Sequence, residues 1–170
     1  MPGAQVGADV TQAYAEWHED LFGFVVSATR DRELAEDLLQ ETFLRLVREV
    51  QAGRPPVSIH PWLYRVASNL VVSKARRRTV AGRWLPLLVQ RDSGEAADVE
   101  ILRREGRGDL ERLLVHLAPD ARVGLLLAAH GFSGAEVAAT IGRTDGATRT
   151  LLCRARLQLG QMIEAEEGMA

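Results

Sequence analysis

The sequence predicts an all-α protein: two small helical domains joined by a linker, the C-terminal one a helix-turn-helix. Leu, Ala, Val, Arg and Glu dominate the composition and aromatic residues make up only 5%, which favours helices over sheets. Apolar residues recur at spacings of three and four along most of the chain. A stretch with several glycines, mixed charge and weak periodicity interrupts the pattern. We therefore expect domains at 10–84 and 109–164, with the linker at 85–108.

The N-terminal domain is expected to contain three helices. The first spans 10–29, after a short segment that we expect to be frayed. Asp31 can cap the second helix, whose apolar stripe runs from Leu34 to Val50. The segment 51–60 should be a loop, because its glycine and its pair of prolines cannot continue a helix. Pro61 fits the first position of the third helix, where its missing N–H does no harm.

The C-terminal domain is expected to end in a helix-turn-helix. Helices should run from Asp109 through Leu117 and from Pro119 to near Gly131. Ser133 and Glu136 form a capping box that starts a short helix, and Gly142 suits the left-handed position just after its end. Thr144 or Asp145 can start the last helix, which should reach about Ile163. Its predicted packing face consists of Thr148, Leu152, Ala155 and Leu159.

Charge is segregated along a chain whose formal net charge is only -2. Residues 1–60 hold ten acidic residues against five arginines, whereas 61–84 hold six basic residues and no acidic one. A second basic stretch, 143–160, has four arginines and one aspartate. Local fields decide where a polyanion docks, so the low net charge does not exclude a nucleic-acid partner.

Several classes of function are not expected. Cys153 is the single cysteine and the four histidines are scattered, so we expect no disulfide, no metal site and no cofactor. No phosphate-binding loop or nucleophile motif is present, which argues against an enzyme. We see no secretory signal and no apolar run near the ~20 residues of a membrane span. The protein is expected to be cytoplasmic, without membrane insertion.

The residue pattern alone leaves two interpretations open for each basic stretch. The last helix fits a DNA-reading helix as well as a helical hairpin with a solvated arginine face. The helix after Pro61 combines Trp62 and Tyr64 with a basic end, as single-strand binders do. A core tryptophan followed by a solvated helix terminus explains that pattern more simply.

Three motifs resemble, in order, those of the extracytoplasmic-function sigma factors of bacterial RNA polymerase. Residues 35–46, AEDLLQETFLRL, closely resemble the polymerase-binding helix of that family. Residues 61–70, PWLYRVASNL, resemble its minus-ten segment, and 142–156 its minus-thirty-five recognition helix. Each motif is suggestive, and the ordered set is quite specific.

The resemblance implies partners and site residues. It implies binding to core RNA polymerase and promoter DNA, with an anti-sigma factor as a restraining partner. Polymerase binding falls on Asp37, Gln40 and Glu41. Binding of minus-ten DNA falls on Arg45, Arg54, Tyr64, Val66, Asn69, Lys74, Arg76 and Arg77. Binding of the minus-thirty-five element falls on Arg149, Thr150, Cys153 and Arg154.

The sequence departs from the family pattern at several positions. Leu151 stands where an arginine is usual, Arg143 replaces an apolar residue of the turn, and Asp145 opposes a nearby phosphate. The loop 51–60 lacks an aromatic residue often found there. These departures imply modest intrinsic DNA affinity, which tethering to polymerase would supplement. The alternatives are a stand-alone helix-turn-helix regulator, which would need a dimer surface, and a degenerate sigma-like protein-interaction module.

Overall fold

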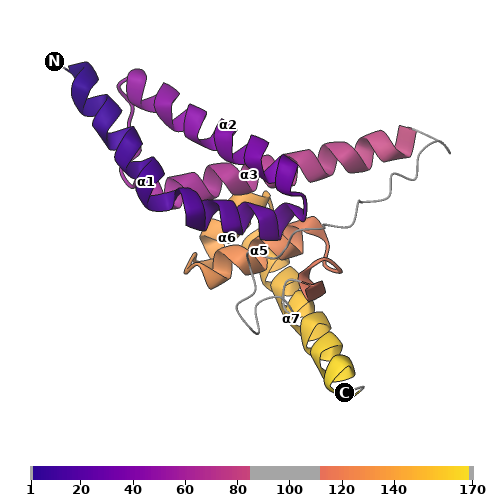
Figure 1. The fold of residues 1–170 in the computed structure, drawn as a ribbon. Helices are drawn as coiled ribbons and strands as arrows, with labels where there is room; N and C mark the ends of the chain where they lie inside the picture. The colour runs from indigo at the N-terminus through magenta and orange to yellow at the C-terminus, as the bar shows by residue number, and fades with distance from the viewer. Residues whose placement is uncertain (1, 85–111, 169–170) are drawn as a thin grey trace. The chain divides into compact units, whose positions relative to one another are not determined.

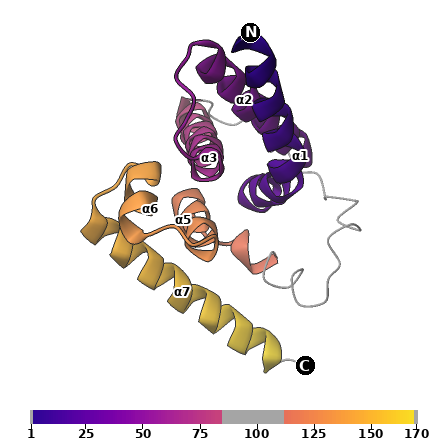
Figure 2. The same ribbon diagram turned by 90° about the vertical axis from the view of Figure 1, so that its left-hand side faces the viewer.

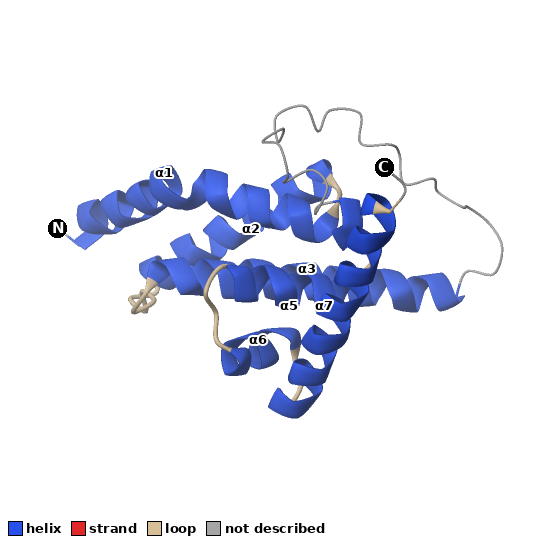
Figure 3. Ribbon diagram, turned by 90° about the horizontal axis from the view of Figure 1, so that it is seen from below, coloured by secondary structure: helices blue, strands red, loops and turns tan. Residues whose placement is uncertain are grey.

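The described part of the protein consists of helices and their connecting turns. The computed structural model describes the backbone of residues 2–84 and 112–168 and the side chains of residues 10–79 and 112–168. Those residues contain no strand (Figure 3), which confirms the all-α prediction. They divide into two compact units, Met1–Val71 and Val72–Ala170. The predicted linker, 85–108, lies outside the described residues.

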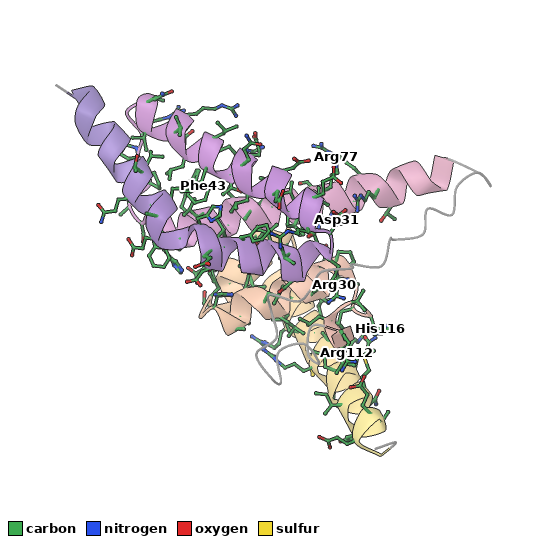
Figure 4. All side chains as sticks on the ribbon, viewed as in Figure 1. Arg30, Asp31, Phe43, Arg77, Arg112 and His116 are labelled. Atoms are coloured by element: carbon green, nitrogen blue, oxygen red, sulfur yellow. The ribbon has the colours of Figure 1, made fainter. Side chains whose placement is uncertain are left out.

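The first two helices, α1 (Pro2–Thr29) and α2 (Arg32–Gln51), run side by side in opposite directions (Figure 1). Between them Arg30 adopts a left-handed φ of 58°. Asp31 then caps α2, its carboxylate accepting a hydrogen bond from the Leu34 N–H at 2.9 Å (Figure 4). The cap prediction is confirmed. The expectation of a frayed start is wrong, because α1 begins at Pro2, a residue type well suited to the first helical turn.

The core of the first unit is formed by the apolar stripes that periodicity predicts. Thr42 is a fully buried polar residue of this core. Its hydroxyl donates a hydrogen bond to the Leu38 carbonyl at 2.7 Å, so the buried donor is satisfied. Burying each large aliphatic side chain contributes about 1.5–3 kcal/mol. The most deeply buried aliphatic side chains are Leu21, Val25, Leu46 and Leu63.

The third helix, α3 (Ile59–Trp84), begins two residues earlier than predicted. Pro61 is therefore its third residue and not its first. The fold tolerates this because the N–H groups of the whole first turn have no partner within the helix. Residues 59–71 of α3 belong to the first unit, and the rest of the helix is grouped with the second.

The second unit contains α5 (Pro119–Ala129), α6 (Gly134–Ile141) and α7 (Asp145–Glu167), and each of these three helices packs against the other two (Figure 2). The predicted helix at 109–117 is described only from residue 112, and only 112–114 are helical. Both capping predictions are confirmed: Ser133 and Glu136 form the capping box, and Gly142 has a φ of 68°. Thr144 is the cap of α7, which continues beyond Ile163 to Glu167.

Arg122 on α5 is a buried cation that donates hydrogen bonds to the backbone carbonyls of the segment just before α5. Its side chain is buried, with the residue 8% exposed. Its guanidinium donates to the carbonyls of Leu114, Val115 and Leu117 at 2.9, 3.1 and 3.1 Å. Carbonyl groups at a helix end lack intrahelical donors and attract positive charge. Arg122 therefore stabilises the junction between 112–117 and α5, a role that the sequence analysis did not assign.

Gly124 lies where α5 packs closely against side chains of α6 and α7. A Cβ at this position would lie 2.9 Å from Cδ2 of Leu152 on α7 and 3.4 Å from Cγ1 of Val137 on α6. Real Cβ atoms do not come as close as 2.9 Å, so a larger residue at Gly124 would require the end of the Leu152 side chain, or the helices themselves, to move. Glycine is unfavourable inside a helix, and close packing explains its presence here.

Candidate nucleic-acid and protein interfaces

The three predicted polymerase-binding residues lie on one face of α2. Asp37, Gln40 and Glu41 are separated by three and four positions, which places their side chains next to one another on the helix surface. Asp37 and Gln40 are exposed, and the Glu41 side chain is 34% exposed. The face is thus an accessible polar and acidic surface that fits a basic protein partner.

Glu41 also forms an ion pair within its own helix. Its carboxylate accepts a hydrogen bond from Arg45 at 2.8 Å and lies 3.6 Å from Arg48. The hydrogen bond from Arg45 is the main cause of a lowered pKa at Glu41. The structure therefore joins a predicted polymerase-binding residue to Arg45, a predicted DNA-binding residue. Exposed pairs of this spacing are weak, so either partner can be recruited by a ligand.

A groove of about 690 Å3 lies between α1 and α2 beside this face. Phe43 of α2 (Figure 4) packs edge-on against Tyr14 of α1, with ring centroids 4.9 Å apart, and Tyr14 remains 47% exposed. Gln40 forms part of the wall, so the groove adjoins the predicted polymerase-binding face. The groove could not be predicted from helical spacing, because two separate helices form it. The other apolar or aromatic wall residues include Phe22, Leu39, Leu44 and Val47.

Most of the predicted minus-ten residues on α3 are accessible. Asn69, Lys74, Arg76 and Arg77 are exposed, and Val66 is half-buried. Arg65, which the sequence analysis did not select, is also exposed and lies one turn before Asn69 on the same face. The spacing of four between Arg65 and Asn69 is the sequence signal that could have identified Arg65 as part of this surface.

Tyr64 is a correction to the predicted surface. It is only 1% exposed and packs against Phe24 of α1, with ring centroids 5.0 Å apart. Burial raises the pKa of its hydroxyl to about 12, and the Asp20 carboxylate adds to the effect. In this structure no base can stack on the ring. Tyr64 faces inward because the apolar face of α3 is the face that α1 covers.

The loop between α2 and α3 is anchored at both ends. The N–H of Arg54 donates to the Glu49 carbonyl at 2.9 Å, and the Arg54 guanidinium lies 3.3 Å from the Glu49 carboxylate. At the other end the Ser58 carbonyl accepts from the Trp62 N–H at 3.4 Å. Val57, between these anchors, is fully exposed. The side chain of Arg54, a predicted DNA-binding residue, is 72% exposed and so is accessible to a ligand.

The predicted minus-thirty-five residues form an exposed strip on α7. Arg149, Thr150, Cys153 and Arg154 are all exposed. Arg149 lies four positions before Cys153, and Thr150 lies four positions before Arg154. The strip is therefore continuous along the helix. The opposite, predicted packing face is buried throughout, which confirms that part of the sequence analysis. The arrangement presents two guanidinium groups on a helix of the size that the major groove admits.

Two departures from the family pattern have structural reasons. Leu151 is partly buried against the apolar cluster that includes Leu113 and Ala155, so an apolar residue packs at a position where arginine is usual. Arg143 donates to the Asp120 carboxylate of α5 through Nε at 3.1 Å and Nη2 at 2.9 Å. These contacts tie the helix-turn-helix turn to α5, a role in packing within the unit.

Neither metal ligation nor membrane spanning is evident in the described part of the chain. Among those residues, no group of three or more His, Cys, Asp or Glu side chains is arranged to hold a metal ion. None of the described helices is both long enough and apolar enough to cross a bilayer.

Comparison with known proteins places both units in one family. Residues 13–80 match the family model "Sigma-70 region 2", and residues 107–159 match "Sigma-70, region 4". The chain is similar to ECF RNA polymerase sigma factor EcfG of Rhodopseudomonas palustris, with 31% identity over 84% of this chain and 78% of the relative. It is also 36% identical to ECF RNA polymerase sigma factor SigE of Mycolicibacterium smegmatis, over 74% of this chain and 50% of the relative.

The solved structures agree in fold. The sigma factor RpoE of Bartonella quintana, crystallised with the anti-sigma factor NepR, matches with a TM-score of 0.64 and 22% identity, over 92% of this chain and 97% of that one. The chain spans about half the length or less of several curated relatives. The two matched regions occur in the order that the motifs predict, and the chain belongs to the ECF family of RNA polymerase sigma factors.

Proposed function

We propose that this protein binds core RNA polymerase and directs promoter-specific initiation of transcription. In this proposal α2 docks on polymerase, the loop and α3 hold opened minus-ten DNA, and α7 reads the minus-thirty-five element. It acts as an initiation factor and not as an enzyme, in the cytoplasm, where polymerase and promoters lie. The relatives named above support the assignment to initiation.

One observation supports this proposal most strongly: the two units each present an accessible surface of the chemistry required. The exposed acidic face of α2 adjoins an apolar groove, as a protein-docking surface does. The exposed strip of α7 holds two arginines opposite a fully packed face. Opened DNA suits the surface of α3, because unstacked bases expose their edges to side chains at a cost of a few kcal/mol.

Reconstitution with core polymerase tests the proposal directly. The full chain should co-purify with core polymerase and yield transcripts from a defined subset of a promoter library. A stand-alone regulator would bind DNA without polymerase, and a protein-interaction module would bind polymerase without selecting promoters. Either of these results would contradict the proposed function.

Reversing two charges on α2 should weaken polymerase binding. We expect the double variant Asp37→Lys, Glu41→Lys to lose roughly tenfold in affinity for core polymerase, about 1.4 kcal/mol. The lysines would repel a basic partner surface. The matched control is Glu16→Lys, Glu19→Lys, which makes the same change in net charge at exposed positions of α1. Equal affinities of the two double variants would remove this face of α2 from the proposal.

Removing the Arg149 side chain should reduce dependence on the minus-thirty-five element. An arginine that pairs with guanine contributes about 1–3 kcal/mol of discrimination, so Arg149→Ala should narrow the difference in transcription between intact and mutated elements about tenfold or more. Transcription from the two promoters measures this ratio. Arg112→Ala, at an exposed position outside α7, should preserve it. A ratio unchanged in Arg149→Ala would place recognition elsewhere.

We also propose that an anti-sigma factor restrains this protein. The neighbour from Bartonella quintana was crystallised with such a partner, and the exposed apolar groove of the first unit offers a surface of the required kind. Affinity purification from the native host should recover the chain with a second protein that blocks its binding to core polymerase. Recovery only as free protein or with polymerase would contradict this part of the proposal.

A further inference from the structure

His60 occupies a position that links the loop 52–58 to the core of the first unit. It is the second residue of α3, directly after the loop. Its ring lies between Trp17 of α1, with centroids 4.4 Å apart, and Tyr64 one turn further along α3, at 4.8 Å. Tyr64 in turn packs on Phe24 at 5.0 Å. Four rings, two from α1 and two from the first two turns of α3, therefore pack in an unbroken series.

The burial of these rings changes along the series. Tyr64 and Phe24 are in the core, at 1% and 3% exposure, whereas Trp17 and His60 are half-buried. The series of four rings thus extends from the core to the surface, where the loop 52–58 meets the start of α3. Aromatic pairs at these separations prefer tilted or edge-on geometry, and the interplanar angles of 48–66° in this series match that preference. Such pairs restrict the orientation of the backbone that bears them.

The loop has few other constraints on its second half. Residues 52–54 are hydrogen-bonded to the end of α2. Pro55 and Pro56 have no N–H group to donate, and Val57 is fully exposed. The path of residues 55–58 therefore depends on the position of the first residues of α3. The packing of the His60 ring on Trp17 and Tyr64 holds these residues in place. A shift in the first turn of α3 would move Val57 and Ser58 directly.

We infer that His60 is a positioning residue: its packing between Trp17 and Tyr64 fixes the loop 52–58 and thereby sets the base preference in the minus-ten element. This inference rests on the proposed function, because it assumes that the loop contacts opened promoter DNA. His60 itself need not touch DNA. Its effect passes through the backbone of the loop.

The test is base preference in reconstituted transcription with the full chain, core polymerase and promoters randomised across the minus-ten element. In His60→Ala the preference for the favoured base should fall roughly fivefold to tenfold, as the loss of one well-placed base contact does. Affinity for core polymerase should stay at the wild-type value. His60→Phe, which preserves the ring packing, should restore most of the preference. His116→Ala, at an exposed position of the second unit, is the matched control and should change nothing.

A purely structural role predicts a different result. Loss of folded protein would lower transcription from all promoters equally and leave the ranking of bases unchanged. An unchanged ranking in folded His60→Ala, or a His60→Phe variant that behaves like His60→Ala, would overturn the inference. Trp17→Leu provides an independent test on α1, because it removes the other half of the packing. It should alter the ranking in the same direction, and a wild-type ranking in Trp17→Leu would equally overturn the inference.

Failure of the inference differs from failure of the proposed function. If the wild-type chain gives no promoter-specific transcription with core polymerase, the proposed function is wrong. If the wild-type chain transcribes selectively and the His60 variants keep its base ranking, only the positioning role is wrong.

Discussion

Replacing Arg122 with methionine should lower the unfolding free energy of the second unit by about 2–4 kcal/mol, because three backbone carbonyls lose a charged donor. The guanidinium contacts the carbonyls of Leu114, Val115 and Leu117 from a buried position. Methionine fills a similar volume and has a similar helix propensity, so the loss reports mainly on these hydrogen bonds. Arg122→Lys should lose part of this energy, since an ammonium lacks the planar fork of donors.

Hydrogen exchange of the α5, α6 and α7 amides measures this effect separately from the first unit, because local opening reports local stability. The opening free energies of these helices should fall together in Arg122→Met. Arg156→Met is the matched control, an identical change at an exposed position of α7, and it should leave exchange nearly unchanged. Equal exchange in the two variants would mean that water replaces the guanidinium at little cost and that Arg122 does not stabilise the junction.

Stability of the first unit should decrease between pH 10 and pH 12 because of Tyr64. Burial raises the pKa of this hydroxyl from 10.0 to about 12. Above pH 10 the unfolded chain loses the tyrosine proton while the folded chain retains it, so unfolding becomes more favourable as pH rises. The contribution is fully present below pH 10 and is lost as pH rises through 12. At about 1.4 kcal/mol for each pH unit, the loss amounts to roughly 2–3 kcal/mol.

Urea unfolding from pH 9 to pH 12, followed by the intrinsic fluorescence of the chain's three tryptophans, measures this loss. Tyr64→Phe should remove most of the slope, because no ionisable group remains at that position. Tyr14→Phe, at the only other tyrosine of the chain and 47% exposed, should leave the slope intact. A Tyr64→Phe variant with the wild-type slope would mean that other groups cause the alkaline loss.

Local sequence signals identified most of the helical framework. Asp31, Ser133 and Thr144 cap helices as their side-chain chemistry favours, and Gly142 adopts the left-handed conformation expected after α6. These features depend on contacts within a few residues, so that sequence spacing is enough to predict them. The boundaries at Pro2 and Ile59 differ from the prediction because apolar periodicity marks the buried part of a helix and not its full length.

The candidate surfaces were predictable where a residue's accessibility follows from helical periodicity. Arg149 and Thr150 lie opposite the packing face of α7, as the spacing of Leu152 and Leu159 indicates. Tyr64 was predicted wrongly because aromatic residues serve equally well in cores and in base stacking. Only its contacts with α1 distinguish the two roles. Leu151 likewise became interpretable once the structure showed the apolar cluster against which it packs.

The sequence by itself determined that this chain forms helices, where most of them are capped, and which family its motifs resemble. Tertiary structure alone decided that Tyr64 is buried, that Arg122 binds three carbonyls, that Arg143 pairs with Asp120 and that a groove lies between α1 and α2. The physical reason is the distance along the chain between the groups that interact. Caps and periodicity arise from neighbours within one or two turns, whereas burial and pairing depend on groups that chain folding brings together from other helices.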